Sequence, residues 1–324
     1  MHAIEVENLA KKFGNFEAVR GVSFKVKRGQ IFAFLGPNGA GKTTTVHILT
    51  TLLRPTSGKA IVAGHDVVEE AKEVRKRIGI VFQDPSVDRD LTAYENMLIH
   101  GGVYGLGGRE LREKIEYLLK FVELWEFKDK PVKYFSGGMQ RRLEIARSLL
   151  HEPEVLFLDE PTLGLDPQTR AHIWDYIETI KEEKDMTIFL TTHYMDEAEK
   201  LADRVSIIDR GKIIAEGSCE ELRRLVGNDV IYLRLDGKGS CFEADFIKMC
   251  KVLPDGRVKL DVDNVSEALP RLFELAKERG VKIVEVTYHR PTLDDVFLHL
   301  TGREIRDEGG ENFKRAILRA RMRR

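Results

Sequence analysis

The spacing of apolar residues changes near residue 30 of the chain. Apolar and polar residues alternate over residues 3–9 (AIEVENL) and 18–26 (AVRGVSFKV). Alternation at period two is typical of strands with one buried face, and it predicts an antiparallel sheet near the N-terminus. Residues 30–36 (QIFAFLG) are instead nearly all apolar, and residues 43–49 (TTTVHIL) follow without a strand pattern. The second pattern predicts a buried strand, a short loop and a helix.

The middle of the chain combines short apolar runs with a long helical stretch. Short runs occur at residues 59–64 (KAIVAG) and 78–84 (IGIVFQD), and they return at 154–160 (EVLFLDE) and 186–193 (MTIFLTTH). Continuous apolar runs are typical of parallel strands that are buried on both faces. Between these runs, residues of about 86–150 show little strand pattern. We therefore predict a mostly parallel α/β core with an inserted helical subdomain.

The last third of the chain has a different pattern. Strand-like segments at residues 229–235, 252–262 and 281–289 surround a helical segment at 266–280, and a Pro-Asp-Gly turn interrupts the second of them. This arrangement predicts a small α+β domain. We find no internal repeat. The expected parts are an α/β domain at 1–225, a small α+β domain at 226–302 and a terminal tail at 303–324.

Length and charge agree with this division. A chain of 324 residues is long for a single core, and a large domain with a smaller one is the usual arrangement. The 52 basic and 53 acidic residues leave a net charge of −1. Because no overall field attracts polyanions, we expect no nucleic-acid partner, and any contact with a membrane surface has to be local.

The cysteines and the apolar segments indicate in which cellular compartment the protein is expected. Cys219, Cys241 and Cys250 are widely spaced and fit no metal-binding pattern, so we expect reduced thiols in a cytosolic protein, with one disulfide as the alternative. The first residues, MHAIEVENLAKKFG, lack the apolar core of a signal peptide. No stretch approaches the length of about eighteen apolar residues that a membrane span needs. The sequence predicts a chain that neither spans a membrane nor is exported.

The predicted loop at residues 36–45 (GPNGAGKTTT) fits the spacing G-x-x-x-x-G-K-[ST]. Consecutive backbone N–H groups of such a loop surround a phosphate, and the following helix adds its positive end. Lys42 is expected to bridge the β- and γ-phosphates of a nucleotide, Thr43 to ligate Mg²⁺ and Thr44 to contact phosphate. A glycine-rich turn with a chance lysine is the alternative. The predicted phosphate-binding residues are Gly36, Pro37, Asn38, Gly39, Ala40, Gly41, Lys42, Thr43 and Thr44.

Polar side chains follow three of the predicted buried strands. Asp159 and Glu160 end the run at 154–160, at the strand end where open α/β sheets bind ligands. Asp159 is expected in the Mg²⁺ shell, and Glu160 is expected to polarise the water that attacks the γ-phosphate. Gln83 can meet Mg²⁺ or this water, and His193 can hydrogen-bond the γ-phosphate. Solvated carboxylates, an ordinary loop glutamine and a structural histidine are the alternatives.

A second candidate phosphate site precedes a long helix. In residues 134–150 (YFSGGMQRRLEIARSLL), Ser136, Gly137 and Gly138 come directly before a segment with an apolar stripe. The serine hydroxyl and the glycine N–H groups at a helix N-terminus can bind a γ-phosphate. The chain therefore carries two separate phosphate-binding motifs.

With the other motifs in place, this stretch resembles the signature of ATP-binding cassette (ABC) ATPases. The phosphate loop, the Gln83 loop, the signature FSGGM, VLFLDE, the GLD turn and His193 occur in the order found in that family. The resemblance implies an α/β P-loop nucleotide-binding domain of ABC type that binds ATP with Mg²⁺ and hydrolyses ATP. Phe135 and Met139 replace the usual leucine and glutamine. These departures affect ATP binding little, because the serine and the glycine backbone make the contacts.

In ABC ATPases two cassettes face each other head to tail. The resemblance therefore implies that the serine and glycines of the signature contact the ATP of a second copy or of a homologous subunit. Asp166 of the GLD turn is expected to line this interface. Phe13 falls where the family stacks an aromatic ring on adenine, and Phe16 is a weaker candidate. For both phenylalanines, a place on the strand face is the alternative.

Longer segments narrow the resemblance. Residues 82–97, 134–167 and 190–218 are similar to ATP-binding subunits of daunorubicin-resistance and related multidrug exporters, and HRPTLDDVFLHLTGRE resembles the ending common there. This implies export of drugs or other amphipathic compounds by a permease that is a separate polypeptide, with the ATPase on the cytoplasmic face of the membrane. The alternatives are a soluble cassette ATPase of nucleic-acid repair or translation and a regulator without hydrolysis, which should lack Glu160 or His193.

The end of the tail, residues 311–324 (ENFKRAILRARMRR), contains six basic residues and one acidic residue. On a helix its apolar residues would share one face, so the segment can lie on an anionic bilayer or dock against a partner. A solvated terminus is the alternative. The tail is the predicted place for contact between this chain and a membrane surface.

Overall fold

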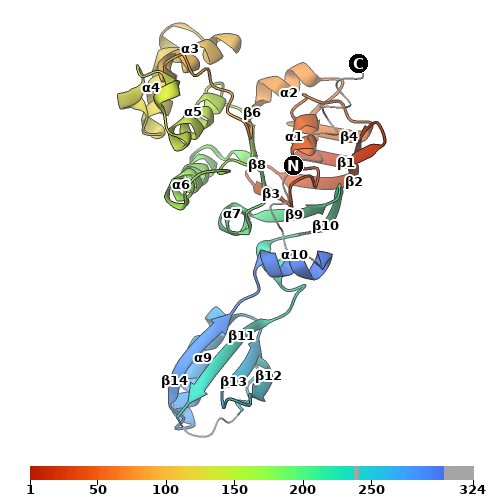
Figure 1. Ribbon diagram of the computed structural model, residues 1–324, viewed down its shortest axis with the longest axis vertical. Helices are drawn as coiled ribbons and strands as arrows, with labels where there is room; N and C mark the ends of the chain where they lie inside the picture. The colour runs from red at the N-terminus through yellow and green to blue at the C-terminus, as the bar shows by residue number, and fades with distance from the viewer. Residues whose placement is uncertain (237–240, 303–324) are drawn as a thin grey trace. The chain divides into compact units, whose positions relative to one another are not determined.

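Figure 1 shows the computed structural model of the chain, which describes residues 1–236 and 241–302. The terminal tail predicted at 303–324 lies outside the described residues. The chain divides into two compact units, of which the first is Met1–Ser218 and the second begins at Cys219. Within the described residues, none of the helices combines the length and the apolar character that a bilayer-spanning segment needs.

An antiparallel sheet begins the first unit, as predicted. It contains, in the order β2-β1-β4-β5, the strands β1 (His2–Phe13), β2 (Phe16–Lys27), β4 (Ser57–Val62) and β5 (His65–Asp66). Ile4 and Val6 of β1 are buried, as the alternation predicts. The next buried side chain on this face is Leu9, because Asn8 has a φ of 47° and the pairing with β2 shifts there. A β-bulge thus interrupts the simple alternation.

The core sheet is mostly parallel, as the continuous apolar runs predict. Only β10 pairs antiparallel in this sheet, with β9. The five residues of β3 and of β7 are all buried, so both faces of these strands are covered. The strands, in the order β10-β9-β3-β8-β7-β6, are β3 (Ile31–Leu35), β6 (Ile78–Val81), β7 (Val155–Asp159), β8 (Thr187–Thr192), β9 (Arg204–Asp209) and β10 (Lys212–Gly217).

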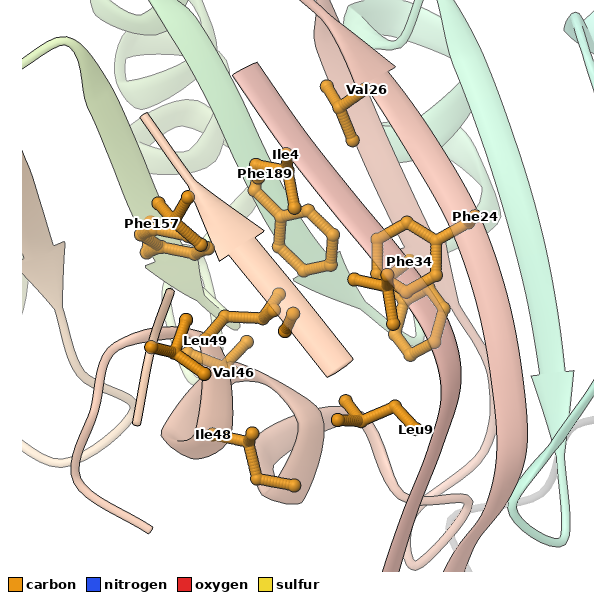
Figure 2. Packing of buried hydrophobic residues seen from close by; sticks show 14 of the residues in the cluster. Ile4, Leu9, Phe24, Val26, Phe34, Val46, Ile48, Leu49, Phe157 and Phe189 are labelled. Atoms are coloured by element: carbon orange, nitrogen blue, oxygen red, sulfur yellow. The ribbon is translucent and has the colours of Figure 1, made fainter. Parts of the chain in front are cut away.

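An aromatic cluster joins the two sheets. The ring of Phe24 on β2 lies 5.4 Å from that of Phe34 on β3 and 5.8 Å from that of Phe189 on β8. Figure 2 shows these rings in one cluster with Val46 and Leu49 of the helix that follows β3. Such aromatic pairs add stability beyond the area they bury. The packing fixes the end of β3 and the start of that helix, between which the predicted phosphate loop lies.

Helices fill the stretch between β6 and β7, as predicted, and Figure 1 shows α3, α4 and α5 grouped beside the core sheet, away from β1 and β2. The first of them begins with a capping box, in which Thr92 and Glu95 bond each other's backbone N–H groups. The helices of the first unit are α1 (Lys42–Leu49), α2 (Ala71–Arg77), α3 (Ala93–Val103), α4 (Gly108–Phe121), α5 (Gly137–Leu149), α6 (Pro167–Lys184) and α7 (Met195–Leu201), with 3-10 turns η1 at Trp125–Phe127 and η2 at Val132–Tyr134.

Two histidines lie inside this helical stretch. The ring of His151 stacks on Tyr104 at 3.8 Å between centroids, and His100 lies 6.1 Å from His151. Burial, with the positive charges of Arg147 and His151, lowers the pKa of His100 to about 4. The folded chain therefore holds His100 neutral at pH values where the unfolded chain protonates it.

Replacing His100 by phenylalanine should flatten the pH dependence of stability. In the wild type, the unfolded state binds a proton near pH 6.5 and the folded state only near pH 4, so the free energy of unfolding falls as pH drops through this window. Allowing for residual solvent, the loss is about 2 kcal/mol. Urea unfolding at both ends of the window measures it. The control is His172→Phe, at an exposed site on α6, which should keep the wild-type dependence of the free energy of unfolding on pH. The same dependence in His100→Phe would contradict the assignment.

The second unit has its own sheet and core. Helix α9 buries Leu272 against Ile231 and Leu260 of the sheet. Cys241 and Cys250 form a disulfide, with their Cα atoms 5.7 Å apart, so the expectation of reduced thiols is wrong for this pair; Cys219 stays outside the bond. The elements are α8 (Cys219–Arg223), β11 (Asp229–Leu235), β12 (Ile247–Val252), β13 (Val258–Val262), α9 (Val265–Glu278), β14 (Ile283–His289) and α10 (Leu293–Thr301), with strand order β12-β13-β11-β14.

Candidate functional site

The loop between β3 and α1 is packed tightly against neighbouring strands. A Cβ atom on Gly36 would lie 2.2 Å from the carbonyl oxygen of Ile208 on β9. Gly41 has a φ of 110°, and a Cβ there would lie 2.5 Å from the carbonyl oxygen of Ala18 on β2. Only glycine fits both positions without moving main chain. The predicted loop residues Gly36, Pro37, Asn38, Gly39, Ala40 and Gly41 form this turn, and Lys42, Thr43 and Thr44 begin α1.

The Lys42 ammonium group is folded back over this loop. Its Nζ donates to the carbonyl oxygens of Gly36 at 2.8 Å and Pro37 at 3.2 Å. It also lies 3.0 Å from Oε1 of Glu160, and both side chains are at least 95% buried. A buried ammonium group at the N-terminal end of a helix, beside a loop of backbone N–H groups, provides a strongly positive site for an anion.

Asp159, the last residue of β7, lies beside Thr43. Its Oδ1 accepts hydrogen bonds from the hydroxyls of Thr43, at 3.3 Å, and of Thr191. Its Oδ2 is buried and accepts no hydrogen bond from any described residue. Burial is the main reason why the pKa of Asp159 is raised, although both hydroxyls oppose the shift. An unpartnered carboxylate oxygen next to a hydroxyl is a donor set that suits Mg²⁺.

Glu160 is held in a strained conformation next to Asp159. Its φ is 49°, in the left-handed region, and its N–H donates to both Oγ1 and the carbonyl oxygen of Thr191 at 3.1 Å. Burial raises the pKa of Glu160, but the contact from His193 and the charge of Lys42 outweigh it, so the pKa lies below its usual value. Nδ1 of His193, which follows β8, lies 3.3 Å from Oε2. The carboxylate is thus ionised and faces an imidazole.

The structure brings together residues that lie far apart in the sequence. Lys42 is the first residue of α1, after the loop that follows β3, while Glu160 directly follows β7 and His193 directly follows β8. These strands are neighbours in the parallel part of the core sheet, whose carboxyl ends meet at one edge. The cluster therefore has an anion site, a carboxylate pair and an imidazole at the edge where the loop begins.

Other predicted residues lie outside this cluster in the single chain. Ser136 caps α5 and accepts from the N–H of Met139, and Asp166 caps α6 and accepts from Thr169. The N-terminal ends of α5 and α6 lie close together, since a Cβ atom on Gly138 would be 2.4 Å from Cγ2 of Thr169. Gly137, beside it, is exposed.

Gln83 and Phe13 occupy the ends of strands outside the cluster. Gln83 lies two residues after β6 with an exposed side chain, and its carbonyl oxygen accepts a bond from Arg141. Phe13 ends β1 with its ring partly exposed, and Nζ of Lys11 lies 5.2 Å from the ring centroid. Phe16 begins β2 and is 40% exposed.

Sequence reasoning missed Thr191. Its hydroxyl donates to the carboxylate of Asp159 and accepts from the backbone N–H of Glu160, so it orients the first side chain and the main chain of the second residue. The only signal in the sequence is its position just before His193, where two threonines replace apolar residues at the end of the run LTTH. A polar residue inside a buried strand needs a partner, and that rule marks both threonines without identifying the partner of either.

A parallel sheet with this loop, two carboxylates at the end of the neighbouring strand and a second glycine-rich helix end defines the ATP-binding cassette class of ATPases. Residues 19–163 match the model of the ABC transporter family, and residues 217–301 match that of the C-terminal domain of DrrA1-3-like ATP-binding proteins. The chain belongs to the ABC transporter family, as an ATP-hydrolysing ATP-binding protein. The predicted family, fold class and enzyme class are confirmed.

Relatives match nearly the whole chain. Daunorubicin resistance ATP-binding protein DrrA3 of Streptomyces coeruleorubidus is 43% identical over 94% of this chain and 97% of its own length. Daunorubicin/doxorubicin resistance ATP-binding protein DrrA of Streptomyces peucetius is 39% identical over 95% of both chains. Linearmycin resistance ATP-binding protein LnrL of Bacillus subtilis is 37% identical over 94% of this chain and 100% of its own. These relatives do not support the alternative in nucleic-acid repair or translation.

Solved structures of ATP-binding cassettes match about two thirds of the chain. The structure of cbiO1 from Clostridium perfringens, part of the ABC transporter complex cbiONQ, has a TM-score of 0.64 and 31% identity, covering 69% of this chain and 93% of that one. A dimeric post-hydrolysis state of the ATP-binding cassette MJ0796 with ADP and Pi has a TM-score of 0.61 and 29% identity, covering 66% and 98%.

Proposed function

We propose that this chain is the ATPase subunit of an export transporter, which lies on the cytoplasmic face of the membrane and powers a separate permease for drugs or other amphipathic compounds. The observation that carries this proposal is the 43% identity to a daunorubicin-resistance ATP-binding protein over 97% of that protein. The similarity includes the small C-terminal domain, which the family model of DrrA1-3-like proteins matches at residues 217–301. The cbiO1 neighbour is itself part of a transporter complex.

At the site, Lys42 and the loop N–H groups bind the β- and γ-phosphates of ATP, and Thr44 adds a phosphate contact. Thr43 and Asp159 hold Mg²⁺, with Gln83 as a further ligand. When bound, Mg²⁺ neutralises the charge that develops on the phosphates. The buried, unpartnered Oδ2 of Asp159 supports this assignment.

Glu160 accepts the proton of the water that attacks the γ-phosphate, and His193 orients that water and the phosphate. The low pKa of Glu160 keeps the carboxylate ready to accept a hydrogen bond from water. In the structure Lys42 is paired with this carboxylate, so a bound γ-phosphate competes with Glu160 for the ammonium group. Substrate binding then leaves Glu160 to its contact with His193.

Two such chains form a head-to-tail dimer in which Ser136, Gly137 and Gly138 of one subunit contact the ATP of the other. Asp166 lines the interface, and the Phe13 ring stacks on adenine. The exposed helix ends at Ser136 and Asp166 support this arrangement, as does the dimeric cassette MJ0796 with ADP and Pi. Contact between the tail and an anionic membrane stays a prediction, because it rests on residues outside the described part of the chain.

Co-expression with a candidate permease, a membrane protein from a neighbouring reading frame, tests the proposal. The two proteins should copurify from detergent, and in vesicles the pair should hydrolyse ATP faster than the isolated chain and move an amphipathic dye. The matched control is the same complex with Glu160→Gln, which should copurify but not transport. The proposal would be contradicted if the chain did not bind the membrane protein and copurified with ribosomes or DNA instead.

A further inference from the structure

Two buried charged residues on α5 contact the loop that carries Gln83. The side chains of Arg141 and Glu144 are 7% and 1% exposed and lie 3.1 Å apart. Arg141 donates to the carbonyl oxygen of Phe82 at 2.6 Å and to that of Gln83 at 3.0 Å. Its guanidinium group therefore joins a helix to the main chain of a loop about 60 residues earlier in sequence, with two nitrogens of the planar fork on two successive carbonyl oxygens.

Glu144 extends the contact along the same loop. Its Oε1 accepts the N–H of Ser86 at 2.6 Å and the Ser86 hydroxyl at 3.2 Å, while its Oε2 faces Arg141. Arg147, one turn further along α5, donates to the carbonyl oxygen of Ser86 at 2.9 Å. The loop from Phe82 to Ser86 is thus bonded to α5 at both ends through its backbone.

A buried ion pair is a poor source of stability by itself, because its desolvation offsets most of the attraction. Here the donors of Arg141 are directed at the carbonyl oxygens of the two peptide groups that flank the Cα atom of Gln83, and those of Ser86 are directed at Glu144. The arrangement fixes a backbone position more than it fills a core. The Gln83 side chain, which is exposed, starts from this fixed backbone.

We propose that Arg141 and Glu144 are positioning residues for ATP hydrolysis, which hold the Gln83 backbone at a set distance from α5. The inference rests on the proposed role of Gln83 at the Mg²⁺ and the attacking water. The signature residue Ser136, five residues before Arg141, caps the N-terminus of the same helix, so the two proposed nucleotide contacts share one rigid element. Without the bonds from Arg141 and Glu144, the position of the Gln83 loop is no longer fixed relative to α5.

A double-mutant cycle between Arg141 and Gln83 tests the inference. Arg141→Lys keeps a positive charge for Glu144 but offers one nitrogen in place of the two that bond the carbonyl oxygens of Phe82 and Gln83. We expect it to lower kcat by about 10- to 100-fold with little change in KM for ATP. In a Gln83→Ala background the same change should lower kcat no further, because Arg141 acts through Gln83. A merely structural effect would multiply with that of Gln83→Ala and would overturn the inference, as would a silent Arg141→Lys.

Arg142→Lys is the matched control. Arg142 lies next to Arg141 on α5 but donates to the carbonyl oxygen of Val122 and to Glu123, away from the Gln83 loop. Its effect on kcat should multiply with that of Gln83→Ala. If Arg141→Lys does not fold, Glu144→Gln, which keeps the volume and the acceptor for Ser86, goes through the same cycle with the same expected coupling. If Gln83→Ala alone leaves kcat unchanged, both the Gln83 assignment and this inference fail, while ATP hydrolysis through Glu160 stands.

Discussion

Glu160→Gln should lower kcat for ATP hydrolysis by about 10² to 10⁴ while ATP affinity stays near that of the wild type. Glutamine has almost the same shape as glutamate but cannot take a proton from water. In the structure, Glu160 is 5% exposed, ionised beside Lys42 and His193, and held by two hydrogen bonds from its own N–H. The backbone bonds do not depend on the side chain, so the substituted residue should keep its place.

The steady-state rate of ATP hydrolysis measures the loss of kcat. The apparent molecular mass of the protein in the presence of ATP shows whether the dimer accumulates. Because hydrolysis is slow in the variant, the ATP-bound dimer should accumulate and be detected by size-exclusion chromatography. Glu154→Gln is the matched control, since Glu154 precedes the other end of β7 and is exposed, paired with Arg28 and Arg77. It should hydrolyse ATP at the wild-type rate. A Glu160→Gln variant with near wild-type kcat would remove Glu160 as the base.

Mixed dimers of Ser136→Arg and Lys42→Ala subunits should recover activity that neither homodimer has. Lys42→Ala removes a charged contact to phosphate that is worth about 1.5 to 3 kcal/mol, which weakens ATP binding about 10- to 100-fold. Arginine at Ser136 blocks the exposed helix end that is proposed to meet the partner's ATP. In a head-to-tail dimer, one site then has an intact loop and an intact signature, and the other site carries both changes. Activity should return to about half of the wild-type value.

Covalently linked pairs allow the mixed dimer to be assayed without its parents. If the signature acted within its own subunit, each site of the mixed dimer would carry one change, and the pair would be as inactive as the parents. Tyr134→Arg is the control for the added charge, because Tyr134 is 63% exposed and lies two residues before Ser136. The Tyr134→Arg homodimer should hydrolyse ATP without a partner of another kind. An inactive Tyr134→Arg homodimer would point to a general effect of charge near α5.

The local pattern of apolar residues predicted strands of the first unit correctly, at residues 3–9, 30–36 and 154–160. This works because a strand buried on one face alternates apolar and polar residues, whereas a strand buried on both faces is apolar throughout. The glycine spacing of the phosphate loop likewise predicted a turn at 36–41. The same reasoning gave the wrong state for Cys241 and Cys250. These cysteines face each other only because β12 returns toward the segment before it, and spacing does not reveal that.

By itself, the sequence determined the elements, their order and the family, and it predicted the residues with phosphate or carboxylate chemistry, since each of these follows from neighbours within a few positions. The tertiary structure alone decided which side chains meet. Lys42 pairs with Glu160, Thr191 bonds the carboxylate of Asp159 and the backbone N–H of Glu160, and Arg141 reaches the carbonyl oxygen of Gln83. These contacts depend on the order of strands in the core sheet and on the packing of α5, which bring together residues separated by tens of positions.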